Sequence, residues 1–403
     1  MWLERRLIKN ISVFCAIIPR NMPNTFTTST TTGYGNRIIN SVKGVVVGCI
    51  FIIGAFGLLY WNEGRKDLSS LARQSTAISA EQVASDASLQ GKLVSVSGAL
   101  TSTGQIGDGL FLQPGGYVSV ARKVEMYAWV ETKNTESHSN AGGSQTDTTT
   151  YTYKQEWTHD PQASQDFAHP EEHANPTESL SDTEVRAESV HVGAYAVGDM
   201  NGVTLPSGSP VTLSAQNTSL SGRAVLANQQ YIFVPNATST GSLSNPEVGD
   251  IRISYSSVHP GMRVTLMGKL DGAAISSYVD QDNNELYRIF SGTRAEAISQ
   301  LHAEYETLTW ILRVVGFVLM LIGFMLIASP IATILDIIPL AGSISSGIIF
   351  LFAFLLSIVL TVITILVSML VHNLVVLLVA VALVIGGVIF WCKRKKAPST
   401  QST

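Results

Sequence analysis

Charged residues are scarce in this chain of 403 residues: Asp, Glu, Lys and Arg together make up 14% of it, and hydrophobic residues make up 46%. Soluble proteins usually carry about 25% charged residues. The mean hydropathy of +0.25 is also high for a soluble chain. This balance excludes a single soluble globule. It equally excludes a disordered chain, which needs high net charge and low hydrophobicity.

Cysteine is nearly absent. The three cysteines, Cys15, Cys49 and Cys392, lie in or near apolar segments. Residues 62–309 contain none, so this region must fold around a hydrophobic core without disulfides. At about 250 residues it is long enough to bury such a core.

Several signatures of catalysis and transport are also missing. The sequence has no Gly-x-Ser-x-Gly, no phosphate loop of the Gly-x-x-x-x-Gly-Lys type, and no cysteine in residues 62–309 that could act as a nucleophile. Acidic residues are absent from the centres of the apolar segments, whereas ion-coupled transporters normally need charges there. These absences argue against a serine or cysteine hydrolase, a nucleotide-binding enzyme and a pump.

What the chain does have is four apolar blocks. They cover residues 44–61, 310–328, 348–371 and 374–391. A helix of about 20 apolar residues spans a hydrocarbon core of roughly 30 Å. We therefore predict four transmembrane helices, the last two of which form a tight hairpin around His372 and Asn373.

Charge is divided unevenly between the ends and the middle. Residues 62–309 hold 15 Lys and Arg against 28 Asp and Glu, a net charge of −13, while all other residues hold 11 and 2, a net charge of +9. Basic segments mark the cytoplasmic side of a membrane protein. Both termini are therefore predicted to be cytoplasmic, with the acidic middle in the lumen or periplasm. That acidic middle argues against nucleic acid as a partner, because nucleic-acid affinity comes largely from Lys and Arg.

The segments outside the spans differ in character. Residues 1–43 are expected to form a basic tail without fixed structure, in which Met22 is an alternative start. Residues 329–347 are expected to form a cytoplasmic loop, and residues 392–403 a basic cytoplasmic tail. Residues 62–309 are predicted to form one large domain.

Alternating and β-branched runs predict that this domain is rich in strands. The predicted strands lie at residues 93–97, 124–131, 149–157, 210–214, 231–234, 251–255 and 263–267. Helices are expected at 68–88 and 294–308, and a flexible hairpin tip at 133–148.

A weak repeat also occurs in the domain. Gly91-x-x-Val-x-Val-x-Gly98 and Gly261-x-x-Val-x-Leu-x-Gly268 share a pattern that is common in small barrels. The repeat indicates either duplicated OB-like β units or a chance match. The predicted fold is a four-helix transmembrane anchor with a large β-rich (α+β) extracytoplasmic domain.

Two groups of side chains offer candidate chemistry. His169-Pro-Glu-Glu-His173 resembles a pair of zinc ligands, but its prolines leave little room for a helix, so a solvated loop is the simpler interpretation. Glu125, Glu131 and Glu156 offer an acid and base pair, but they also fit outward-facing positions that alternate with apolar residues. We predict no metal, no cofactor and no catalytic residue.

Glycines recur in the first two spans, where they allow helices to approach closely. They are Gly44, Gly48, Gly54, Gly57, Gly316 and Gly323. Their pattern is compatible with packing inside the helix bundle and with self-association.

Six motifs follow one another along the chain. They are Asn62-Glu-Gly-Arg65, Val124-Glu-Met-Tyr-x-Trp-Val-Glu131, Glu156-Trp157, Asn175-Pro176, Pro246-Glu-Val-Gly-Asp-x-Arg-x-Ser254 and Thr309-Trp-x-Leu-Arg-x-x-Gly316. Together they resemble the LUMA family (transmembrane protein forty-three), four-pass proteins with one large domain between the first two spans. The resemblance covers about residues 45–395, nearly the whole chain.

The resemblance implies a non-enzymatic role. Animal members are described as proteins of the inner nuclear membrane and endoplasmic reticulum that organise membrane complexes, with emerin and lamins as partners and self-association through the spans. The family also occurs in bacteria, where the protein would lie in the cytoplasmic membrane. No catalytic residues carry over from it.

These arguments predict a multi-pass membrane scaffold that contacts lipids, self-associates and organises membrane protein complexes. The alternative is a membrane-anchored enzyme or lipid-handling accessory. The residues expected to carry family-specific contacts are Asn62, Glu63, Gly64, Arg65, Glu125, Tyr127, Trp129, Glu131, Trp157, Asn175, Pro176, Pro246, Gly249, Asp250, Trp310, Arg313 and Gly316.

Overall fold

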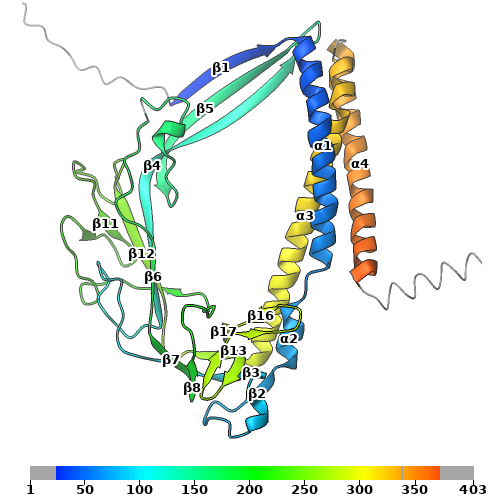
Figure 1. The fold of residues 1–403 in the computed structure, drawn as a ribbon. Helices are drawn as coiled ribbons and strands as arrows, with labels where there is room; N and C mark the ends of the chain where they lie inside the picture. The colour runs from blue at the N-terminus through cyan, green and yellow to red at the C-terminus, as the bar shows by residue number, and fades with distance from the viewer. Residues whose placement is uncertain (1–23, 172, 337–338, 373–403) are drawn as a thin grey trace, which may run out of the picture.

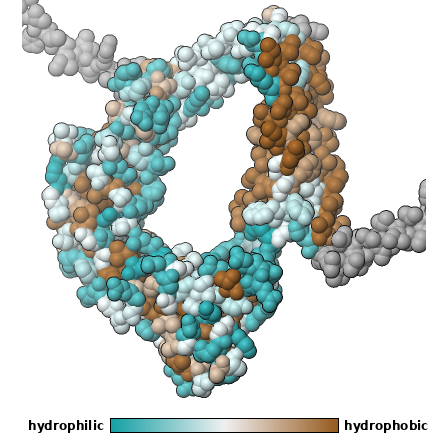
Figure 2. All heavy atoms as spheres, in the orientation of Figure 1, coloured by the Kyte–Doolittle hydropathy of each residue, from teal (hydrophilic) through white to brown (hydrophobic). Residues whose placement is uncertain are grey.

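The computed structural model describes residues 24–171, 173–336 and 339–372. Long helices form one side of the molecule, a β-rich domain extends from one end of them to the opposite side of the molecule, and a strand ribbon returns from the domain to the other end of the helices (Figure 1). The three parts form a ring around an open centre, which is also visible with all atoms drawn (Figure 2).

Three helices are long and apolar enough to cross a membrane, among the residues that the structure describes. The helices are α1 (Tyr34–Glu63), the short α2 (Leu68–Gln74), α3 (Arg294–Leu335) and α4 (Pro339–His372). Helices α1, α3 and α4 contain the first three predicted spans. The fourth, at 374–391, lies outside the described residues.

The helices extend beyond the predicted apolar blocks. Most of the expected loop at 329–347 is helical, because α3 continues through Pro330 to Leu335 and α4 begins at Pro339. The expected unstructured tail also holds the first turns of α1 and, before them, a strand. The polar first turns of α1 continue the helix because tertiary contacts hold them, whereas α3 continues because residues 331–335 are mostly apolar.

Helices α1 and α3 pack closely through glycine. A Cβ atom on Gly48 would lie 2.6 Å from the carbonyl oxygen of Gly323, and one on Gly316 would lie 2.6 Å from a methyl group of Leu59. These glycines therefore serve packing within the chain. Gly54 and Gly57 have open space beside them.

The domain contains a closed barrel. Its strands are β3 (Leu93–Thr103), β7 (Ser189–Val192), β8 (Tyr195–Val197), β14 (Ala274–Ser276) and β13 (Arg263–Asp271), with β2 (Thr76–Ile78) and β17 (Arg288–Ser291) added at the sides. The barrel closes because β13 pairs with β3 as well as with β14. Buried apolar residues such as Val94, Leu100 and Leu266 fill it.

The two repeat segments are neighbours in this barrel. Val94 lies opposite Gly268, and Gly98 lies opposite Val264. The antiparallel register therefore relates the two copies of the pattern by an approximate twofold axis near Val96 and Leu266. Their common origin stays a prediction.

A second sheet adjoins the barrel. It contains β1 (Thr25–Thr32), β5 (Gln145–Thr158), β4 (Ser119–Ser139), β12 (Ile251–Val258), β11 (Ile232–Val234) and β10 (Val225–Leu226) in that order, with β6 (Thr183–Arg186) and β9 (Ser209–Pro210) at its margin. Strands β15 (Tyr278–Val279) and β16 (Glu285–Leu286) form a separate pair. The apolar core of the second sheet includes Val124, Met126 and Ile253.

Strands β4 and β5 extend far beyond this core. We call β1 together with residues 127–139 of β4 and 145–157 of β5 the ribbon. The expected hairpin between residues 124–131 and 149–157 is present, but its expected tip at 133–148 is too long, because β4 continues to Ser139 and β5 starts at Gln145. A run of threonines favours the extended chain here, and Gly142 and Gly143 make the turn with φ angles of 88° and 83°.

The helix expected at 68–88 is also too long. It ends at Gln74, where the guanidinium of Arg294 donates hydrogen bonds to the carbonyl oxygens of Ala72, Arg73 and Ser75. A cation that satisfies the last carbonyl groups ends a helix in this way.

Candidate functional site

Two sequence motifs meet where α1 and α3 reach the domain. Arg313 donates hydrogen bonds from Nε and Nη2 to the two carboxylate oxygens of Glu63, each at 2.8 Å. The Glu63 side chain is only 4% exposed. Asn62, fully buried, donates to the carbonyl oxygen of Thr309 at 3.2 Å. We call Asn62, Glu63, Thr309 and Arg313 the clamp, because they join the end of α1 to the middle of α3.

Aromatic residues surround the clamp. The guanidinium of Arg65 lies 5.3 Å from the ring centre of Tyr305 and 5.9 Å from that of Trp61. Arg313 lies 4.9 Å from the ring centre of Trp310. Trp61 and Trp310 are themselves exposed. Exposed tryptophans at the end of an apolar helix mark the membrane–water interface.

The domain is held against this end of the helices by short polar contacts. Asp67 begins α2 and accepts hydrogen bonds from the backbone of Ser69 and from Nδ1 of His302, both at 2.8 Å. Lys66 forms ion pairs with Asp280 and Asp282 at 2.9 and 2.8 Å.

Helix α3 itself enters the domain. It begins with a capping box between Thr293 and Glu296 and runs for 42 residues without interruption, which is about 63 Å. The connection between span and domain is therefore stiff, since it has no flexible linker.

A second group of motif residues lies on the sheet. Arg252 forms an ion pair with Glu125 at 2.8 Å, and its guanidinium lies 4.8 Å from the ring centre of Trp157. The Trp157 ring also contacts Tyr127, with ring centres 5.4 Å apart. Burial raises the pKa of Glu125, but the hydrogen bond and charge of Arg252 outweigh burial and hold that pKa below its usual value.

The other candidate carboxylates also have partners. Glu156 forms an ion pair with Lys154 at 2.8 Å. Glu131 accepts hydrogen bonds from the hydroxyl of Tyr153 and from the backbone N–H of Ala168. Each carboxylate therefore has a local polar partner.

Asn175 completes the open edge of β4. Its side-chain oxygen accepts the backbone N–H of Trp129 at 2.7 Å, and its amide nitrogen donates to the Trp129 carbonyl at 2.9 Å. The side chain thereby replaces a neighbouring strand. Next to it, the imidazole of His173 stacks on Tyr153, with ring centres 3.8 Å apart. Among the described residues, which do not include Glu172, no group of three or more His, Cys, Asp or Glu side chains could hold a metal ion.

The remaining motif residues form a third contact. Gly249 has a φ of 94°, and a Cβ atom there would lie 2.7 Å from Pro176. The buried carboxylate of Asp250 accepts hydrogen bonds from the backbone N–H groups of Asn236 and Glu247 at 2.9 and 2.8 Å. The motifs thus meet at the clamp and on the sheet, where the second and third groups are continuous because Tyr127 exchanges backbone hydrogen bonds with Gly249 and Asp250.

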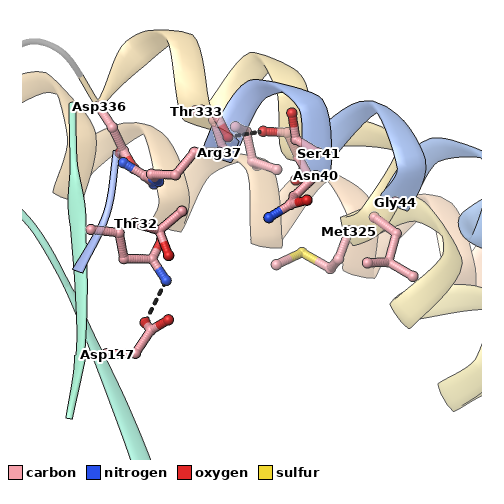
Figure 3. Close-up of a pocket in the computed structure, with 14 residues that line it drawn as sticks. Thr32, Arg37, Asn40, Ser41, Gly44, Asp147, Met325, Thr333 and Asp336 are labelled. Atoms are coloured by element: carbon pink, nitrogen blue, oxygen red, sulfur yellow. Dashed lines mark hydrogen bonds and ion pairs between the residues drawn. The ribbon is translucent and has the colours of Figure 1, made fainter. Parts of the chain in front are cut away.

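The contacts at the opposite end of the helices did not follow from any sequence motif. Arg37 donates to Asp336 and to the carbonyl oxygen of Gly143, each at 2.6 Å, and Ser139 donates to Asp336 at 2.8 Å. We call Arg37, Ser139, Gly143 and Asp336 the latch. It adjoins a cavity of about 400 Å³ between ribbon, α1 and α3 (Figure 3). The sequence offered one sign that Asp336 has a special role. It is one of only two acidic residues outside 62–309, and the other is Glu4.

A family model described as Transmembrane protein 43 matches residues 126–374. Transmembrane protein 43 of Rattus norvegicus is 26% identical, over 76% of this chain and 79% of its own length. The Homo sapiens protein is 26% identical over 77% and 80%, and the Drosophila melanogaster homolog is 24% identical over 68% and 74%. No solved structure was found to match. The chain, with its clamp built from two of the motifs singled out above, belongs to the Transmembrane protein 43 (LUMA) family of membrane proteins.

Proposed function

We propose that this protein is a multi-pass membrane scaffold that self-associates and organises membrane protein complexes. The observation that carries the proposal is the stiff connection between spans and domain. The clamp fixes α1 to α3, and α3 continues into the domain as one helix. A partner bound to the domain would be held at a fixed place relative to the spans.

One face of α1 supports self-association. Among the residues that the structure describes, Gly54 and Gly57 have no neighbour within 4 Å of an added Cβ atom, and they are exposed. In a membrane this face can approach another helix closely. The glycines Gly48, Gly316 and Gly323, in contrast, are occupied by packing within the chain.

The proposed location follows the charge pattern. Basic residues before the first span and after residue 391 support cytoplasmic termini, with the domain in the lumen or periplasm. In a eukaryotic host the membrane would be the inner nuclear membrane or endoplasmic reticulum, with nuclear-envelope organisation as the process and emerin- or lamin-type partners. In a bacterium it would be the cytoplasmic membrane.

The test uses two differently tagged copies expressed together in native membranes and crosslinked before solubilisation. The wild-type copies should be captured together. Gly54→Leu with Gly57→Leu should abolish joint capture without changing expression, because neither position contacts any other described part of the chain. Val46→Leu, a change on an exposed site of the same helix, is the control. Wild-type copies that are never captured together would reject self-association.

An apolar groove supports the alternative of a lipid-handling accessory. It lies between α3 and α4, has a volume of about 340 Å³, and is lined by residues including Phe317, Ile358 and Thr361. Such a groove suits an acyl chain. Thr361→Trp would fill it. Under the lipid-handling alternative, the purified Thr361→Trp variant should lose bound lipid, as measured by mass spectrometry. Under the scaffold hypothesis, Thr361→Trp should leave joint capture of the two tagged copies unchanged.

A further inference from the structure

The second sheet has an open edge on the side of the ring opposite the helices. Among the described residues, β10 is the last strand of this sheet and pairs only with β11. Strand β11 lies across the ring from α1 and α3 (Figure 1), so these helices do not cover the edge. An open edge can accept a further strand, and proteins usually blunt or cover the edges that they do not use.

The backbone of Leu226 points out from this edge. The N–H of Ala227 donates to the carbonyl oxygen of Tyr231 at 3.0 Å, so these two residues form a hydrogen-bonded pair of the antiparallel ladder. Hydrogen-bonded and non-hydrogen-bonded pairs alternate in such a ladder. Leu226, which lies opposite Ile232, therefore belongs to a non-hydrogen-bonded pair, and its N–H and C=O groups point away from β11.

A groove with a volume of about 510 Å³ adjoins the edge. Its lining includes five apolar side chains, which are those of Val225, Ala227, Phe233, Pro235 and Leu243. Val225 is 50% exposed, so the groove is open to solvent beside β10. Alternate residues of a strand share one face of a sheet. A strand added to β10 would therefore direct every second side chain to the face on which the groove lies.

Arg223 brings an uncompensated positive charge to the same groove. Its side chain is exposed and belongs to the lining. Its guanidinium donates to the carbonyl oxygens of Asn236, Ala237 and Ser239, which uses three of its five N–H donors. The described part of the chain gives Arg223 no ion pair with a carboxylate. A carboxylate from outside the chain can bind the remaining donors.

We propose that this edge and groove bind an extended segment of a partner protein, in which an apolar residue is followed two positions later by an acidic one. The segment would pair with the backbone of Leu226 as an antiparallel strand. Its apolar side chain would lie beside Val225 and its carboxylate would face Arg223, because residues two apart on a strand share a face. Strand addition takes affinity from main-chain hydrogen bonds and specificity from pockets for alternate side chains.

This inference rests on the proposed scaffold and deepens it, because it names the kind of partner that the domain holds. It does not depend on self-association, since the edge and the groove belong to one copy of the chain. The two proposals can therefore fail separately.

The test selects random decapeptides, displayed on phage, against the full-length protein purified in detergent. We expect enrichment of an apolar residue followed two positions later by Asp or Glu. Val225→Glu should abolish this enrichment, because it places a carboxylate beside Arg223 in the groove. Its thermal unfolding should be unchanged, since Val225 is half exposed. Leu220→Glu, at an exposed position outside the groove lining, is the control and should select the same peptides as the wild type.

A second variant separates charge from apolar contact. Arg223→Gln should remove the preference for the acidic residue and keep the preference for the apolar one. Lys92→Gln, at an exposed position elsewhere in the domain, should change neither preference. If Arg223→Gln lowers the unfolding temperature, Val225→Glu alone decides. Absence of any enriched peptide with the wild type would overturn the proposal, as would selection of the same peptides by Val225→Glu.

Hydrogen exchange then tests the mode of binding. With the enriched peptide bound, the amide of Leu226 should exchange at least about tenfold more slowly, because strand addition gives it a hydrogen-bond partner. An unchanged rate at Leu226 would overturn strand addition. If peptides are enriched while wild-type copies are never captured together, self-association fails and the groove stands. If joint capture depends on Gly54 and Gly57 while no peptide is enriched, the groove fails and self-association stands.

Discussion

The two ends of the α1–α3 pair are each closed by an arginine and a carboxylate, but the settings differ. At the clamp, Arg313 binds both oxygens of Glu63, whose side chain is 4% exposed. At the latch, Arg37 binds one oxygen of Asp336 beside a cavity of about 400 Å³. The Arg37 and Asp336 side chains are also largely buried, at 10% and 11% exposed. The clamp joins helix to helix with two hydrogen bonds between its charged groups, whereas the latch joins helices to a hairpin tip with one such bond, so we expect the latch to be the weaker closure.

The largest effect is expected at the clamp. Glu63→Gln leaves Arg313 buried without a counter-charge, which typically costs 3–5 kcal/mol of unfolding free energy, so we expect a loss of about 4 kcal/mol. Thermal unfolding of the purified protein in detergent measures it. The double variant Glu63→Gln with Arg313→Gln should recover most of the loss. If Glu63→Gln lowers the unfolding free energy less than a latch variant does, the ranking of clamp above latch is wrong.

The next effect tests whether close packing continues from the clamp toward the latch. Gly48→Ala places a methyl group 2.6 Å from the Gly323 carbonyl oxygen, so we expect a loss of about 1–3 kcal/mol from overpacking. Gly54→Ala meets nothing and should be neutral or slightly stabilising. The same unfolding assay compares them. Equal behaviour of the two alanine variants would show that α1 and α3 do not pack through Gly48.

A smaller effect is expected at the latch. Arg37→Gln removes the contacts to Asp336 and to Gly143, and we expect about 1 kcal/mol of lost stability because the polar cavity allows water to replace them. The hairpin tip at 140–144 should become more sensitive to protease, as measured by limited proteolysis. Lys43→Gln, at an exposed position nearby, is the control. Unchanged proteolysis of Arg37→Gln would mean that the latch does not hold the tip.

The smallest effect concerns acid at the domain end. Hydrogen bonds from the backbone and side chain of Asn284, more than the ion pair with Lys66, hold the pKa of Asp280 far below its ordinary value of 3.8. A lowered pKa means that the contribution of Asp280 to stability is present above the ordinary value and is lost only as pH falls through the lower, folded-state pKa. The amides of Asp282 and Asn284 should keep their hydrogen-exchange protection down to about pH 3. Loss of that protection already near pH 4 would contradict this.

Much of the architecture was predictable from local patterns. The apolar blocks at 44–61, 310–328 and 348–371 lie inside α1, α3 and α4, because a membrane-length apolar run has one main structural solution. The strands at 93–97 and 263–267 lie inside β3 and β13 for a similar reason: alternation fixes which face is buried.

The ribbon was not predictable in the same way. Residues 133–148 are polar, Gly-containing and Ser/Thr-rich, which locally indicates a flexible loop. They form strands because β1, more than 100 residues earlier in the chain, pairs with β5. Likewise, Asn62 and Thr309 were recognised as motif residues, but their mutual contact depends on the antiparallel packing of α1 and α3. Local sequence carries no information about such distant pairing.

Strand β1 has a consequence for how the protein is made. Thr25 pairs with Thr152, so the ribosome completes β1 and α1 well before the partner strand exists. At about 5–20 residues per second, β1 waits for several seconds with both backbone edges unpaired while α1 enters the membrane. Strand β1 can therefore pair only after β5 has been synthesised. Biogenesis of this protein thus contains an obligatory delay, in which a strand near the start of the chain waits for a partner made more than 100 residues later.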